Sequence, residues 1–367
     1  MVDEPLVLLN PGPACTTERV RGALGRGDMC HREPEFGELL ASIRSGLTRC
    51  LGLADTHEAV LVTGSGTSAM EMAVISAVRE GRAVLVVSNG VYGDRLLKIA
   101  KANGIPAYEV KGEWTRPIDP AAVREALAAH PDVDAVACVH HETTTGLINP
   151  IQQVGEIVAA TEACFVIDAI SSTGNEDADL AAVHADLICG TANKGLHGLP
   201  GIAFVLLSSD KGVRRIQEAP PRSLYLNAAT YLDGQRRGDV PFTPAVQVCY
   251  ALEEAIAEFE ERGGLAARVA EYRDRAALLR KGFAGLGLEI LVDEPYRSNS
   301  VTMLRLPEGV AYDDLHDELR AHGFVIYAGQ GRLSEEFFRV CNMGELPLPT
   351  LERFLEALDK AICKLQG

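Results

Sequence analysis

Residues 186–205 read Asp-Leu-Ile-Cys-Gly-Thr-Ala-Asn-Lys-Gly-Leu-His-Gly-Leu-Pro-Gly-Ile-Ala-Phe-Val. This pattern predicts a short buried strand, a glycine-rich turn that carries one lysine, and a second apolar strand. Lys194 is the only lysine or arginine between Ala185 and Asp210. Burial would lower the pKa of its amine, and a neutral amine can attack a carbonyl carbon and hold it as a Schiff base. The alternative is a lysine that only solvates a turn.

A second stretch favours the chemical interpretation. Residues 164–172 read Cys-Phe-Val-Ile-Asp-Ala-Ile-Ser-Ser, an apolar strand with Asp168 at its carboxyl end. Ligands of open α/β sheets lie outside the carboxyl ends of the strands. Pyridoxal 5'-phosphate needs a lysine to bind its aldehyde and a carboxylate to keep its ring nitrogen protonated. Lys194 and Asp168 can supply these two groups from neighbouring strand ends.

A third strand end predicts an anion site. The apolar run 59–62 is followed by Thr63-Gly64-Ser65-Gly66-Thr67-Ser68-Ala69 and then by a helix. Small residues at a helix start leave backbone N–H groups free to bind a phosphate. The loop also fits the loose dinucleotide fingerprint Gly-x-Gly-x-x-Ala. That site expects an acid at the end of the next strand, where Ser88-Asn89-Gly90 stands instead. We therefore expect a lone phosphate rather than a dinucleotide.

Three further positions have two interpretations each. Tyr92, between glycines at a strand end, either stacks on a planar ring or lies in an ordinary turn. Arg339, flanked by Phe338 and Val340, either forms a structural ion pair or clamps a carboxylate. Arg32 either contacts an anion at the mouth of the site or is solvated. The adjacent His140 and His141 would point to opposite faces of a strand, so we expect no metal site there.

The order of elements predicts an α/β fold. Strands alternate with helices from about residue 59 to 205, which indicates a mostly parallel sheet covered on both faces. From about residue 265 the pattern changes to a smaller α+β unit, with strands expected at Leu288–Leu291, Ser300–Leu304, Phe324–Tyr327 and Phe337–Cys341. Arg222–Asp233 reads as irregular. We expect a large domain of residues 15–262 and a small domain made of residues 1–14 and 263–367.

Composition narrows the class of protein. The chain has 367 residues and a formal net charge of −16, which argues against nucleic acid or an anionic membrane as a partner. Its nine cysteines are odd in number and form no Cys-x-x-Cys pair, as is usual in a reducing compartment. No signal peptide and no apolar run long enough for a membrane span is recognisable. We therefore expect a cytoplasmic protein.

With these residues in hand, the chain resembles the class V aminotransferases of fold type I over nearly its whole length. The motifs that carry the resemblance are Asn10-Pro11-Gly12-Pro13, Gly64-Ser65-Gly66-Thr67, Ser88-Asn89-Gly90-Val91-Tyr92-Gly93, His141-Glu142-Thr143-Thr144-Thr145-Gly146 with Asn149-Pro150, residues 166–172, Ala192-Asn193-Lys194, Gly198-Leu199-Pro200-Gly201 and Gly323-Phe324-Val325-Ile326-Tyr327. Within the family they are most like those of transaminases that pass the amino group of 2-aminoethylphosphonate to pyruvate, which gives phosphonoacetaldehyde and L-alanine.

The resemblance implies a role for each matching residue. Lys194 would bind pyridoxal phosphate and shuttle the proton, Asp168 would pair with the ring nitrogen, and Tyr92 would stack on the ring. Ser65, Gly66 and Thr67 would hold the phosphate, with Asn193 beside it and Thr143 on the 3-oxygen side of the ring. Thr243 would reach the phosphate in a partner subunit, which implies a homodimer with shared sites. Arg339 would grip the carboxylate of pyruvate or alanine.

Alternatives remain for the substrate. The stretch His31-Arg32-Glu33-Pro34-Glu35-Phe36 looks more like relatives that use serine or alanine with pyruvate or glyoxylate, and phosphonopyruvate is another possible acceptor. A phosphonate donor needs cations, which Arg339 together with Arg32 or Arg95 could supply. A nucleotide-binding oxidoreductase or a non-catalytic binding protein is disfavoured by the Asp168 and Lys194 pair and by the missing ribose acid.

Overall fold

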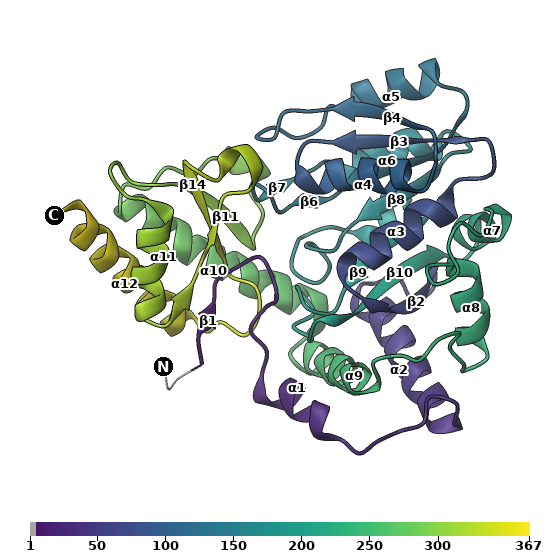
Figure 1. The fold of residues 1–367 in the computed structure, drawn as a ribbon, viewed down its shortest axis with the longest axis horizontal. Coiled ribbons are helices and arrows are strands. Elements are labelled where there is room, and N and C mark those ends of the chain that lie inside the picture. Colours follow the sequence, from purple (N-terminus) through teal and green to yellow (C-terminus); the bar gives the residue numbers. More distant parts are fainter. Residues whose placement is uncertain (1–4) are drawn as a thin grey trace.

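The computed structural model describes residues 5–367, and its main feature is a seven-stranded sheet in the order β2-β10-β9-β8-β5-β3-β4 (Figure 1). All neighbours from β9 to β4 are parallel, while β10 runs antiparallel to both β2 and β9. This confirms the mostly parallel sheet. Its strands are β2 (His57–Gly64), β3 (Ala83–Ser88), β4 (Ala107–Lys111), β5 (Val133–Val139), β8 (Cys164–Asp168), β9 (Leu187–Thr191) and β10 (Gly201–Ser208).

Helices cover both faces of this sheet, because the strands are apolar on both sides. In β2, Ala59 and Leu61 enter one core while Val60 and Val62 enter the other, as the two-residue period of a strand requires. The first core also contains residues of α2 (Pro34–Cys50), α5 (Pro120–Ala129), α6 (Ile151–Ala159) and α9 (Val246–Glu261). The second contains residues of α3 (Gly66–Ala77), α4 (Val91–Ala102), α7 (Lys211–Glu218) and α8 (Ala228–Arg236).

A smaller unit has its own sheets and core. The strand β1 (Val7–Leu8) pairs in parallel with β12 (Phe324–Val325), and β11 (Val301–Arg305), β14 (Phe337–Cys341) and β13 (Tyr327–Ala328) form an antiparallel sheet. They pack with α10 (Gly264–Gly285), α11 (Tyr312–Ala321) and α12 (Leu348–Gln366) around a core that includes Leu9. The division into residues 15–262 and residues 1–14 with 263–367 stays a proposal, and its first four residues lie outside the described part.

Two local predictions were wrong, and one hairpin was not predicted. Leu288–Leu291 forms no strand, because only an isolated bridge joins Ile290 to Leu304. The segment read as irregular contains the start of α8, whose first turn is capped by Asn227 through a hydrogen bond from the N–H of Thr230 (3.2 Å). The sequence also gave no sign of the hairpin β6 (His141–Glu142) and β7 (Leu147–Ile148), whose four-residue turn supplies functional candidates.

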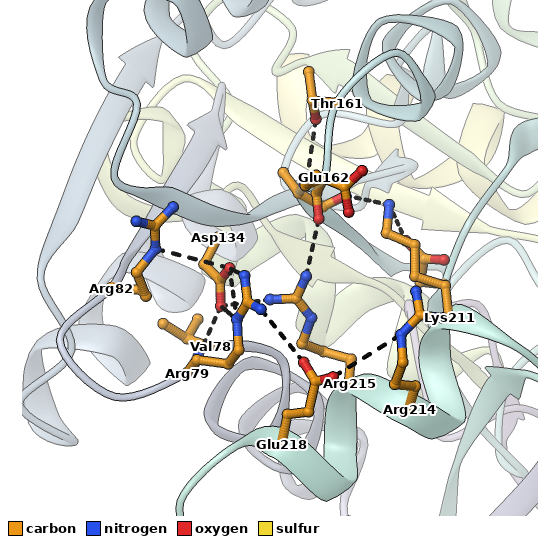
Figure 2. A network of polar contacts seen from close by, with 12 residues as sticks. Val78, Arg79, Arg82, Asp134, Thr161, Glu162, Lys211, Arg214, Arg215 and Glu218 are labelled. Atoms are coloured by element: carbon orange, nitrogen blue, oxygen red, sulfur yellow. Dashed lines mark hydrogen bonds and ion pairs between the residues drawn. The ribbon is translucent and has the colours of Figure 1, made fainter.

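A buried carboxylate lies near the amino-terminal end of β5, an interior strand of the large sheet. Asp134, near the start of β5, accepts hydrogen bonds from the guanidinium and the backbone N–H of Arg79 and lies 2.5 Å from the guanidinium of Arg215 (Figure 2). The side chains of Asp134 and Arg215 are 1% and 5% exposed. Burial alone raises the pKa of Asp134, but the hydrogen bonds from Arg79 and Arg215 outweigh it and lower this pKa to about 2.

Asp134→Asn is expected to destabilise the protein by about 3 kcal/mol, because it leaves the buried Arg215 without its counter-charge. Since the pKa of Asp134 lies below the ordinary aspartate value, its contribution is present above about pH 4 and is lost as the pH falls through about 2. Chemical denaturation at pH 7 and at pH 3 measures both effects. The matched control is Asp210→Asn, which removes an exposed ion pair with Arg214 and should cost less than about 1 kcal/mol. Equal losses in the two variants would contradict the prediction.

Candidate active site

The predicted site residues meet at the carboxyl edge of the large sheet. A cavity of about 270 Å³ opens there, between the ends of β2 and β9 and the start of α4. Its walls contain many of the residues singled out in the sequence. They are Gly64, Ser65, Gly66, Thr67, Tyr92, Arg95, Ile170, Thr191, Asn193, Lys194, Pro200 and Gly201. Parallel strands bring these distant segments together because their carboxyl ends share one edge.

Lys194 lies in the turn between β9 and β10 and is buried. Its amine donates a hydrogen bond to the carbonyl oxygen of Pro11. Burial lowers the pKa of Lys194 to about 8; the charge of Asp168 opposes this shift, whereas Arg339 and Arg95 add to it. The desolvation expected from the sequence is therefore present. A Cβ atom on Gly12 would lie 2.8 Å from Cε of Lys194, so glycine at position 12 leaves room for the lysine.

Asp168 is the last residue of β8 and its side chain is also buried. One carboxylate oxygen accepts a hydrogen bond from the N–H of Ile170 (3.0 Å). Burial raises the pKa of Asp168 to about 6, against the opposing effects of that hydrogen bond and of the charges on Arg95 and Lys194. A carboxylate in this state gains stability from any cation that comes into contact with it.

The start of α3 has the form of an anion site. Ser65 is the N-cap residue, yet its side chain makes no capping hydrogen bond, and the helix begins at Gly66. Gly66 and Thr67, the first two residues of the helix, line the cavity, and the cap provides no side-chain acceptor for their N–H groups. Thr67 adds a hydroxyl, which accepts a hydrogen bond from the guanidinium of Arg95 (3.1 Å). A cation thus stands beside the expected phosphate position.

Arg95 also covers the ring of Tyr92. The guanidinium carbon lies 4.6 Å from the ring centroid, within the range of a cation–π contact. Both residues come from α4, one turn apart, and both line the cavity. Of the two arginines considered as a second cation, Arg95 is therefore the one that the chain itself brings to the cavity.

Thr143 and Thr145 carry hydroxyls that have no partner. The Oγ1 atoms of both residues are buried and make no hydrogen bond within the described residues. Buried hydroxyls are normally satisfied, so a bound polar group is the simplest partner for them. Thr144 differs from them, because its hydroxyl donates to Glu142 (2.5 Å).

Arg339 is held by backbone and amide oxygens only. Its guanidinium donates to the carbonyl oxygens of Ala328 (3.0 Å) and Thr143 (3.3 Å) and to the side chain of Gln330 (3.4 Å). Among residues 5–367 no Asp or Glu lies within ion-pair distance of it, although its side chain is buried. Of the two interpretations from the sequence, a structural ion pair is therefore not observed in the described part of the chain.

Five predicted residues do not line this cavity: Asp168, Thr143, Arg339, Arg32 and Thr243. Of these, Arg32 and Thr243 belong to other hollows of the surface. Arg32 pairs with Asp239 and donates to the carbonyl oxygen of Val240 (2.7 Å). Thr243 is exposed and lines a separate hollow with Tyr225 and Phe242. Within a single chain neither reaches Lys194. The contact of the Pro11 carbonyl oxygen with Lys194 could not be predicted from the sequence, because every residue has a backbone carbonyl group and residue type gives no sign of its partner.

No group of three or more His, Cys, Asp and Glu side chains within residues 5–367 is arranged to hold a metal ion. The same part of the chain contains no helix with the length and apolar character needed to cross a membrane.

The fold and the buried lysine define an α/β transferase of fold type I. The chain belongs to the class-V aminotransferase family, whose model matches residues 17–334. It is 33% identical to the 2-aminoethylphosphonate–pyruvate transaminase of Syntrophobacter fumaroxidans, over 98% of this chain and 97% of the relative. It is 34% identical to the enzyme of the same name from Klebsiella pneumoniae, over 99% of both chains. Among solved structures, the alanine–glyoxylate aminotransferase of Nostoc sp. has a TM-score of 0.92 at 26% identity, covering 99% of this chain and 96% of that one.

Proposed function

We propose that this protein is a pyridoxal-phosphate-dependent transaminase that moves the amino group of 2-aminoethylphosphonate to pyruvate, giving phosphonoacetaldehyde and L-alanine. The observation that carries amino transfer is the buried Lys194, whose lowered pKa favours a nucleophilic amine in the cavity that Ser65, Gly66 and Thr67 also line. The choice of donor and acceptor is supported by the full-length relatives of that name.

The residues present fit pyridoxal phosphate. The open start of α3 suits its phosphate, the partnerless hydroxyl of Thr143 suits its ring oxygen, and Asp168 has an oxygen to offer its ring nitrogen. Once bound, pyridoxal phosphate supplies an aldehyde that takes up the amino group and a ring that accepts electrons from the adjacent carbon. Lys194 would attach the cofactor covalently, and its amine would move a proton during the reaction. Asn193 would lie beside the phosphate, and Tyr92 would support the ring.

Two arginines can pair with the negative charges of the substrates. Arg339 is buried without an acidic partner among the described residues, which suits it to a bidentate pair with a carboxylate or a phosphonate. Arg95 lines the cavity and supplies a second positive charge. Local cations of this kind are needed because the chain as a whole carries a net charge of −16.

Arg339→Lys is expected to raise the KM for pyruvate and for L-alanine by about 10- to 100-fold while pyridoxal phosphate stays bound, because an ammonium cannot reproduce the fork of a guanidinium. Half-reaction kinetics with L-alanine measure this. The control is Arg305→Lys on β11, since Arg305 pairs on the surface with Glu289 and Glu336. An L-alanine half-reaction as fast as in the wild type would show that Arg339 is structural.

The donor is tested with a panel scored by L-alanine formation from pyruvate. We expect 2-aminoethylphosphonate to convert the bound cofactor to its amine form far faster than L-serine does. The competing function is a transaminase that uses an α-amino acid donor with glyoxylate or pyruvate, supported by the structural similarity to the Nostoc alanine–glyoxylate enzyme. A faster reaction with serine would replace the first proposal with this one and would direct attention to residues 31–36.

We further propose a homodimer with shared sites, in the cytoplasm and without nucleic acid as a partner. Leu224 is 85% exposed and stands next to Tyr225, whose hydroxyl donates to the carbonyl oxygen of Thr63 before the phosphate loop (3.0 Å). An exposed apolar surface beside the site suits contact with a second copy, and Thr243 and Arg32 could then reach the partner's cavity. All nine cysteines are free, as expected in a reducing compartment. Sedimentation equilibrium tests the dimer, and a monomeric mass at micromolar concentration would contradict it.

A further inference from the structure

We propose that Glu142 and Thr144 are positioning residues, which hold the first turn of α4 and thereby direct Tyr92 into the cavity. This inference rests on the proposed function, since it concerns the support of the cofactor ring. In the run Thr143-Thr144-Thr145, the hydroxyls of Thr143 and Thr145 have no partner within residues 5–367, whereas the hydroxyl of Thr144 donates to Glu142.

The first turn of α4 has no cap of its own. Its N-cap residue is Gly90, which offers no side chain, so the first N–H groups of the helix need acceptors from elsewhere. The hydroxyl of Thr144 accepts from the N–H of Val91 (3.0 Å). One oxygen of Glu142 accepts from the N–H groups of Tyr92 (3.2 Å) and Gly93 (3.3 Å). These three hydrogen bonds end on two acceptor atoms, both from the β6–β7 hairpin, about fifty residues along the chain.

The other carboxylate oxygen of Glu142 is hydrogen-bonded to Thr144. It accepts from the backbone N–H of Thr144 (3.0 Å) and from its hydroxyl (2.5 Å). The four hydrogen bonds to the carboxylate of Glu142 all come from N–H or O–H donors, which suits a carboxylate at a helix N-terminus. Burial raises the pKa of Glu142 to about 7, and the hydrogen bonds from Thr144 and Gly93 oppose that shift. The hydroxyl of Thr144 donates its only proton to Glu142 and accepts from the N–H of Val91, so it has no proton left to donate to a cofactor.

The fit is too close for another residue at position 90. Glu142 is fully buried, and a Cβ atom on Gly90 would come within 2.3 Å of its carboxyl carbon. The backbone at Gly90 is extended, so the need for glycine comes from this contact rather than from strain. The side chain of Glu142 therefore packs directly against the backbone of Gly90, two residues before Tyr92. A displacement of its carboxylate would pass to the ring of Tyr92 through two backbone hydrogen bonds.

The test compares Thr144→Val, which loses the hydroxyl at nearly constant volume, with Thr144→Ser, which keeps it. Titration of the apo form of each full-length variant with pyridoxal phosphate gives its dissociation constant. Visible circular dichroism reports how the bound ring is held, and the melting temperature of the apo form reports stability. We expect Thr144→Val and Glu142→Gln to bind pyridoxal phosphate about tenfold more weakly and to lose part of the dichroic signal, and Thr144→Ser to stay within about twofold of the wild type.

A double-mutant cycle separates positioning from general stability. If Thr144 acts through Tyr92, the effect of Thr144→Val on the dissociation constant should shrink to less than about twofold in a Tyr92→Leu background. A full tenfold effect in that background would overturn the proposal. So would a lower apo melting temperature with unchanged cofactor affinity and dichroism.

Cofactor binding by the wild type and by the Thr144→Val variant distinguishes the proposed function from the positioning role of Thr144. A wild-type protein that takes up no pyridoxal phosphate overturns the proposed function and this inference with it. A wild type that binds the cofactor, with a Thr144→Val variant that binds it equally well, overturns the inference alone. If Glu142→Gln does not fold, the two Thr144 variants still decide the outcome.

Discussion

The Lys194→Ala variant is expected to lose the proposed transaminase activity by roughly four orders of magnitude or more. Lys194 is the only lysine that lines the cavity, and its amine is assigned two duties: covalent attachment of the cofactor and movement of the proton. Burial lowers the pKa of Lys194 to about 8, so a substantial fraction of the amine is neutral near physiological pH. Alanine removes both duties and leaves the surrounding backbone in place.

The measurement does not depend on turnover alone. Wild-type protein treated with borohydride in the presence of pyridoxal phosphate should carry the reduced cofactor on the peptide that contains Lys194. The Lys194→Ala variant should carry none and should lack the absorbance band of lysine-bound cofactor. The control Lys98→Ala, on the exposed side of α4, should retain the label and the rate. A label found on another lysine would show that the assignment is wrong.

Much of this site could be predicted because it follows strand ends. Asp168 and Lys194 stand at or just beyond the ends of apolar runs, and a parallel sheet brings such ends to one edge. The small residues after β2 likewise predicted a helix start without a side-chain cap, as found for α3. Spacing and residue type were sufficient there, because the governing geometry is that of the sheet itself.

The other contacts of the site could not be predicted, because they join segments that are far apart in the sequence. Arg32 and Arg95 looked equally suited to bind an anion, yet Arg32 pairs with Asp239, 207 residues away, and only Arg95 lines the cavity. The carbonyl oxygen of Pro11 contacts the amine of Lys194 across 183 residues. Such pairings depend on packing between segments that are distant in sequence. The residues next to an arginine in the sequence therefore do not predict which group it will contact.

Asp168→Asn is expected to preserve the fold and the binding of pyridoxal phosphate while lowering kcat by roughly three orders of magnitude. Asparagine has the same shape and can still accept the hydrogen bond from the N–H of Ile170 through its carbonyl oxygen. It carries no negative charge, however, so it cannot stabilise a proton on the ring nitrogen. Without that proton the ring is a weaker electron sink, and the loss should appear in the chemical step rather than in affinity.

A cofactor methylated on its ring nitrogen tests this cause directly, because it carries the positive charge permanently. If Asp168 acts through that charge, the methylated cofactor should restore part of the rate in Asp168→Asn. Burial already raises the pKa of Asp168 to about 6, so the wild-type carboxylate gains stability when a cation approaches it. The ring and the carboxylate should therefore stabilise each other's charged forms, and this coupling is what asparagine removes. A folded Asp168→Asn variant with near-normal kcat, or one that the methylated cofactor leaves equally slow, would show that Asp168 has another role.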